Sequence, residues 1–80
     1  MKRLRGARPK LLRAGDIAKH FKITPQMVHV YATMGLIRER RRTPAGYRLF
    51  GPETLERLRV IREMNRRYPL RELARMFFKS

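Results

Sequence analysis

The sequence has no cysteine, no tryptophan and only 6 acidic residues among 80 positions. Without cysteine the chain cannot form a disulfide bond, a thiolate metal site or a thiol nucleophile, and this composition fits a reducing cytoplasm. The two histidines, His20 and His29, do not form a metal-binding HExxH motif, and the sequence has no glycine-rich phosphate loop. These absences remove the common catalytic and metal-binding arrangements, so we expect no enzyme activity, no metal and no cofactor.

Long hydrophobic runs are also missing. The longest apolar stretch is interrupted by His29, Thr33 and Gly35, whereas a membrane-spanning helix needs about 18 apolar residues. The stretch MKRLRGARPK over residues 1–10 has a basic start but is not followed by the hydrophobic core of a signal peptide. We therefore expect an intracellular protein without membrane association, located in the cytoplasm with the nucleoid.

Residues 1–10 show no periodic apolar pattern and contain Gly6 and Pro9. We expect them to form a mobile basic arm, and residues 11–80 to form one domain with a small core. Two roles for the arm stay open. One is contact with DNA phosphates or a minor groove, and the other is solubility alone.

What the sequence has in excess is positive charge. Lys and Arg number 21, which gives a formal net charge of +15. Self-repulsion on this scale destabilises a small domain unless a polyanion neutralises it, and nucleic acid is the commonest such partner. A basic RNA- or ribosome-associated protein is an alternative. However, the chain lacks the paired exposed aromatic residues on which single-strand readers stack bases, so double-stranded DNA is favoured.

Apolar residues at helical spacing predict a short helix over 14–21. These residues are Leu12, Ile17, Ala18 and Phe21. Asp16 lies near the positive end of this helix, where an acidic side chain is stabilising. Ile23 then provides an apolar plug between this helix and the next.

A second helix is predicted over 25–34. Thr24 can cap its free N–H groups, Pro25 suits the first turn, and Gly35 can take the left-handed conformation after its end. Two short helices joined by a tight turn form the helix-turn-helix arrangement. On the second helix Val28 and Tyr31 fall on the inward face. The outward face is mixed and carries Gln26, His29, Val30 and Thr33.

The stretch RERRRTPAGYRLF predicts a basic hairpin. Pro44 presets a bend and Gly46 can take a positive φ, so residues 43–46 form a turn. Residues 40–43 and 47–50 then pair as two antiparallel strands. Arginines at 38, 40, 41, 42 and 48 would face a duplex backbone if the preceding helix lay in a major groove. The alternative is an edge strand that its charge protects from aggregation.

Two further helices are predicted over 52–66 and 70–77. Pro52 suits the start of the first, and its apolar stripe is Leu55, Leu58, Ile61 and Met64. Leu70, Leu73, Ala74 and Phe77 give the last helix its buried face. The predicted fold is therefore mainly α, a winged helix-turn-helix with four short helices and a small two-stranded antiparallel hairpin as the wing.

This order of elements, with RTPAGYRLF followed by TLERLRVI, resembles the DNA-binding domain of the MerR family of bacterial transcription regulators. The likeness covers about Leu12 to Phe77, and its most specific part is Arg42-Thr43-x-x-Gly46-Tyr47-Arg48. It implies that helix 25–34 lies in the major groove and that wing 40–48 touches the phosphate backbone. It also implies a homodimer on a pseudo-palindromic promoter, with RNA polymerase as a further partner.

The sequence departs from the family pattern in two places. Where the family commonly has Arg-Tyr-Tyr-Glu, this chain has His29-Val30-Tyr31-Ala32, so an imidazole replaces a strong phosphate contact. Family members also continue into a long dimerisation helix and an effector domain, whereas this sequence stops at Ser80. We therefore expect no small-molecule effector within this chain. An isolated domain of a longer regulator, a stand-alone regulator and a mobile-element factor such as a small excisionase all stay open.

The predicted function is that of a sequence-specific, double-stranded DNA-binding transcription regulator. The alternatives are a phage or mobile-element accessory in recombination or packaging, and a basic RNA-binding protein. The predicted base contacts are Gln26, His29 and Thr33. The predicted backbone contacts are Thr24, Val30, Arg40, Arg41, Arg42, Tyr47 and Arg48.

Overall fold

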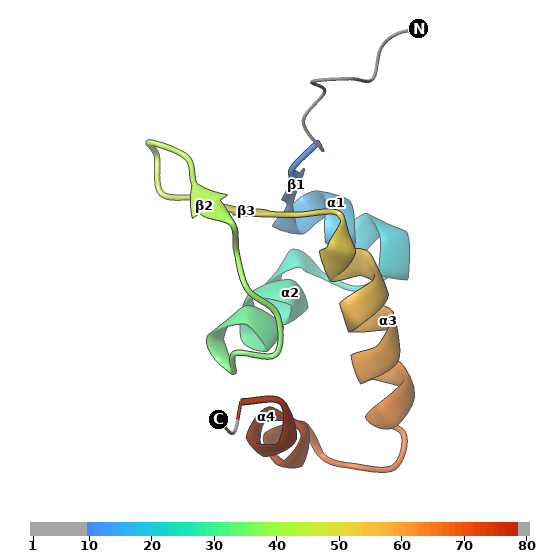
Figure 1. Ribbon diagram of the computed structural model, residues 1–80. Coiled ribbons are helices and arrows are strands. Elements are labelled where there is room, and N and C mark those ends of the chain that lie inside the picture. Colours follow the sequence, from blue (N-terminus) through green and yellow to red (C-terminus); the bar gives the residue numbers. More distant parts are fainter. Residues whose placement is uncertain (1–9, 79–80) are drawn as a thin grey trace, which may run out of the picture.

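The computed structural model describes residues 10–78, so residues 1–9 of the predicted basic arm lie outside it. Within this range seven elements follow one another along the chain (Figure 1). They are β1 (Leu12–Arg13), α1 (Ala14–Phe21), α2 (Pro25–Thr33), β2 (Arg41–Arg42), β3 (Arg48–Phe50), α3 (Glu53–Met64) and α4 (Leu70–Phe78). The mainly α fold with a wing-like hairpin is confirmed.

α1 and α2 form the predicted helix-turn-helix, and α1 has the predicted bounds. The carboxylate of Asp16 accepts a hydrogen bond from the backbone N–H of Arg13 at 2.9 Å, which places a negative charge at the positive end of the helix. Lys22 then turns the chain with a left-handed φ of 58°. The N–H of Ile23 donates to the carbonyl of Ala18 at 2.9 Å and closes the turn.

Both ends of α2 are set by local hydrogen bonds. At its start, the hydroxyl of Thr24 accepts from the N–H of Met27 at 3.2 Å, as the capping residue was predicted to do. The helix ends at Thr33, one residue earlier than predicted, because Met34 forms the C-cap. Gly35 follows with a φ of 81°, and the N–H of Leu36 donates to the carbonyl of Tyr31 at 2.9 Å. This is the Schellman arrangement, in which a residue of positive φ satisfies the last carbonyls.

The sheet has three strands in the order β1-β3-β2, all antiparallel. The predicted hairpin is confirmed as the pair β2 and β3, in which Arg42 lies opposite Arg48. The third strand was not predicted. β1 pairs with the other edge of β3, with Leu12 opposite Phe50. It thereby fixes the base of the wing to the start of α1.

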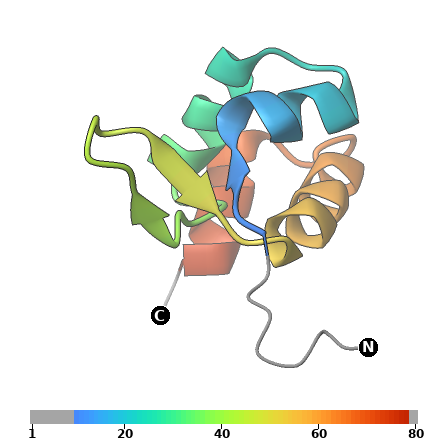
Figure 2. The same cartoon turned by 90° about the horizontal axis from the view of Figure 1, so that it is seen from above.

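The core lies where α1, α2, α3 and α4 meet the inner side of β3. Its fully buried large side chains are Phe50, Ile17, Leu36, Ile37, Leu58, Ile61, Leu73 and Val28. α3 begins with Glu53 after Pro52 and ends at Met64, within the predicted range, and α4 packs through Leu73. Figures 1 and 2 show that the β2–β3 hairpin projects on one side of the molecule and that α3 lies on the opposite side. This leaves the outer side of the wing uncovered by helices.

Candidate nucleic-acid interface

The outward face of α2 is open to solvent. Gln26 and Thr33 are exposed, as is Val30 with 39% of its surface accessible, whereas Val28 and Tyr31 are buried as predicted. His29 is only half-buried because it faces the wing. The helix can therefore pack inward through one stripe while polar groups of the opposite stripe remain available to a ligand.

The tip of the wing is a hydrogen-bonded turn. The N–H of Thr43 donates to the carbonyl of Tyr47 at 2.8 Å, and the N–H of Tyr47 donates back to the hydroxyl of Thr43 at 3.0 Å. Gly46 has a φ of 93°, as predicted, which is a conformation that a side chain disfavours. Tyr47 is 62% exposed, so its side chain is accessible to a ligand.

Glu39 binds two of the arginines that were predicted to contact the DNA backbone, which are called the clamp arginines below. Its carboxylate accepts from Nε of Arg42 at 2.6 Å and from Nε of Arg48 at 2.7 Å. The hydrogen bond from Arg42, supported by that from Arg48, lowers the pKa of Glu39 below its ordinary value although slight burial opposes the shift. The carboxylate therefore stays ionised at neutral pH. The carboxylate accepts a hydrogen bond from Nε of each guanidinium group, so it orients both arginines. Arg42 belongs to β2 and Arg48 to β3.

Arg48 also connects the wing to α2. Its Nη1 donates to Nδ1 of His29 at 3.0 Å, a contact between residues 19 positions apart. Glu39, Arg48 and His29 are thus linked by hydrogen bonds that run from the base of the wing to α2. The orientation of the wing relative to α2 is consequently held by a contact between His29 and Arg48, both of which were predicted to contact DNA.

The remaining predicted clamp arginines lie at the base of the wing. Arg40 pairs with Glu53 of α3 at 2.9 Å. An exposed ion pair of this kind is weak, so it can exchange for a phosphate at small cost. Arg41 is exposed and its side chain has no hydrogen-bond or ion-pair partner among residues 10–78. Among the clamp arginines, Arg41 is therefore the one whose guanidinium group pairs with no other side chain in the described part of the protein.

A shallow hollow of about 220 Å³ lies where α1, α2 and the wing meet. It is lined by Arg13, Ala14, Gly15, Pro25, His29, Tyr47 and Arg48. Its lining surface is mainly apolar, and the first residues of α1 and α2 form part of its wall. Helix N-termini carry a partial positive charge and free N–H groups, and here they lie beside two guanidinium groups. The hollow therefore suits an anionic, elongated surface such as a nucleic-acid backbone.

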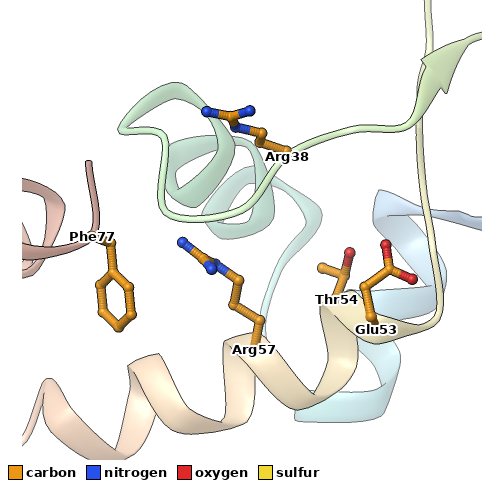
Figure 3. Close-up of a pocket in the computed structure, with 5 residues that line it drawn as sticks. All are labelled: Arg38, Glu53, Thr54, Arg57 and Phe77. Carbon is orange, nitrogen blue, oxygen red and sulfur yellow. The ribbon is translucent and has the colours of Figure 1, made fainter. Parts of the chain in front are cut away.

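Arg57 braces the segment that leaves α2. Figure 3 shows its side chain extending from α3 between Thr54 and Phe77, below Arg38. Its Nε donates to the carbonyl of Leu36 at 2.6 Å, and its guanidinium lies 4.9 Å from the centre of the Phe77 ring. These contacts join α3, α4 and the end of the helix-turn-helix. Arg57 thus has a structural role, which the sequence alone did not distinguish from the role predicted for the arginines of the wing.

The sequence predicted the helices and the hairpin that form this surface, but it did not predict the roles of Glu39 and Arg57. A signal for Glu39 was present, since it is the single acid within the run of arginines over residues 38–42. Nothing in the sequence marks Arg57. Among residues 10–78, no group of three or more His, Asp or Glu side chains could hold a metal ion. In the same range, no helix combines the length and the apolar character needed to cross a membrane.

Comparison with known proteins points to the same family that the sequence motifs resemble. A family model described as MerR HTH family regulatory protein matches residues 12–77. The chain is also similar to the mercuric resistance operon regulatory protein of Bacillus cereus, with 35% identity over 52 residues, or 65% of this chain. The matched part spans only 39% of that regulator. Because the family model covers most of the sequence, the chain belongs to the MerR HTH family of regulatory proteins.

Proposed function

We propose that this chain is a sequence-specific DNA-binding transcription regulator that holds a duplex with its wing and reads the sequence with α2. The observation that carries the proposal is the contact between Arg48 and His29. It joins the basic wing and the recognition helix into one surface around the hollow at the helix N-termini. Membership of the MerR HTH family supports a DNA-binding regulator.

In this proposal the phosphate backbone runs along the wing and past the hollow where α1, α2 and the wing meet. Arg40, Arg41, Arg42 and Arg48 supply charge, Tyr47 supplies a hydroxyl, and the exposed N-terminal end of α2 at Thr24 supplies the partial positive charge of the helix dipole. Arginine suits this task because its planar guanidinium group can donate two hydrogen bonds to a phosphate while another of its N–H groups bonds to the protein. The wing therefore contributes affinity for any duplex.

Specificity in this proposal comes from α2. Gln26 and Thr33 are exposed on its outer face, and His29 stands beside them with one ring nitrogen engaged by Arg48. An amide can form a bidentate pair with adenine, and a hydroxyl can pair with several bases. A duplex that placed its major groove against α2 would meet these groups first.

The regulator is proposed to act as a homodimer on a pseudo-palindromic site, in the cytoplasm and on the nucleoid, with RNA polymerase as a further partner. Two-fold symmetric regulators place their recognition helices in half-sites about one helical turn, or a multiple of it, apart. The half-site spacing of a bound sequence therefore reports the assembly directly.

Selection of bound sites from a random duplex pool tests this proposal. We expect recovery of a defined sequence, bound at least 10³-fold more tightly than random duplex at near-physiological salt, as is typical for specific regulators. A folded RNA of matched length should compete no better than random duplex. Equal binding to the recovered site and to scrambled DNA, or better binding to RNA, would contradict the proposal.

A further inference from the structure

An apolar side chain stands in the middle of the outward face of α2. Val30 is 39% exposed, whereas Val28 on the same helix is fully buried. Gln26, Val30 and Thr33 are separated by four and three residues, so they lie in one row along the helix surface. Val30 thus occupies the centre of the row that the proposed function turns toward DNA.

The core does not account for this valine. Val30 is absent from the buried cluster and from the half-buried apolar residues that pack against it. Among residues 10–77, whose side chains the structure describes, the exposed large apolar side chains are Val30, Tyr47, Tyr68 and Met76. Val30 alone of these four lies on α2, and its β-branched side chain has few rotamers, which holds its two methyl groups in place.

The chemistry of a duplex offers one matching partner in the major groove. Most groups there are hydrogen-bond donors or acceptors, but thymine carries a C5-methyl group. A phosphate, in contrast, needs a donor, and valine has none. We therefore propose that Val30 is a specificity-determining residue that contacts the C5-methyl group of a thymine in the bound site. The inference rests on the proposed function and replaces the backbone contact expected for this position from the family resemblance.

The geometry also limits where this thymine lies. Gln26 and Val30 are four residues apart on α2, a rise of about 6 Å along the helix. Successive bases on a strand are about 3.4 Å apart. The thymine should therefore lie within about two base pairs of the base that Gln26 contacts, inside each half-site.

Uracil substitution tests the contact, because uracil differs from thymine only by the missing methyl group. Each thymine of one half-site in the selected sequence is replaced singly by uracil, and the Kd of the wild-type chain is measured for each duplex. One substitution should weaken binding roughly fourfold, the value for losing one buried methyl-sized group. Val30→Ala should weaken binding to the thymine site by a similar factor and should not distinguish thymine from uracil at that position.

Met76→Ala is the matched control, because Met76 is an exposed apolar residue of α4, which is not one of the elements assigned to the proposed surface. It should keep the wild-type ratio between the two duplexes. The proposal is overturned if no single uracil weakens wild-type binding, or if Val30→Ala stays as sensitive as the wild type. It is equally overturned if Thr33→Ala, and not Val30→Ala, removes the sensitivity. Failure to recover any preferred site would instead overturn the proposed function on which the inference rests.

Discussion

Arg48→Ala should weaken binding both to the selected site and to random duplex, and should reduce the salt dependence of binding. Arg48 uses Nε for Glu39 and Nη1 for His29, and its Nη2 has no partner among residues 10–78. This group is therefore available to donate to a phosphate. Each phosphate contact contributes about 0.9 to the slope of log K against log salt concentration. Losing one contact should lower the slope by that amount, so the affinity deficit at about 50 mM salt should be about 3.5 times that at about 200 mM.

Fluorescence anisotropy on the selected site and on a random duplex, over a salt series, measures both slopes. Arg59→Ala is the matched control. Arg59 carries the same charge and is also held by a glutamate, Glu56, at 2.7 Å, but it lies on α3, on the side of the molecule opposite the wing (Figures 1 and 2). Its slope should stay at the wild-type value. An unchanged slope for Arg48→Ala, or an equal loss for Arg59→Ala, would refute the placement of the backbone on the wing.

Three further predictions concern the free protein. Thr24→Ala should remove the cap of α2, costing about 1 kcal/mol of unfolding free energy and lowering Tm by roughly 4–8 °C; differential scanning calorimetry measures this, and a Tm equal to that of Thr33→Ala would contradict it. Gly46→Ala should lower the free energy of unfolding by about 1 kcal/mol, and Tm with it, because φ is 93° at this position. Gly15→Ala should raise Tm, because an added Cβ meets open space within a helix; two changes of the same sign would count against this account. Finally, the pKa of Glu39 is lowered by its hydrogen bond from Arg42, so its stabilising contribution is complete above the ordinary glutamate pKa and is lost as pH falls through the folded-state value. Thermal melts from pH about 5 to about 3 should therefore show a steeper loss of Tm in the wild type than in Glu39→Gln, and parallel curves would rule out this role.

The helices were predictable because their signals are local. Thr24 caps a helix whose first free N–H groups lie within three residues of it, and Gly35 ends that helix within its own Schellman hydrogen bonds. The same holds for the hairpin turn, where Gly46 and Thr43 are neighbours in the chain. In each case the residue that carries the signal also makes the contact.

Contacts between distant residues were not predictable in this way. Leu12 pairs with Phe50 in the sheet, and no alternation around residue 12 marks that strand. The sequence predicted no role for Arg57, because its contacts Leu36 and Phe77 lie far from it along the chain. The grouping of Glu39, Arg48 and His29 likewise depends on the fold that brings the wing against α2.

The contact between Arg48 and His29 also determines where the imidazole keeps its proton. A guanidinium can only donate, so Nδ1 of His29 accepts in this contact and the ring hydrogen lies on Nε2. His29 consequently offers DNA one donor and no acceptor. It can pair with a phosphate oxygen, with N7 or O6 of guanine, with N7 of adenine or with O4 of thymine, but not with the amino group of cytosine. In the proposed complex the wing would thereby restrict which bases this position of α2 can accept, although its own predicted contacts are with phosphates.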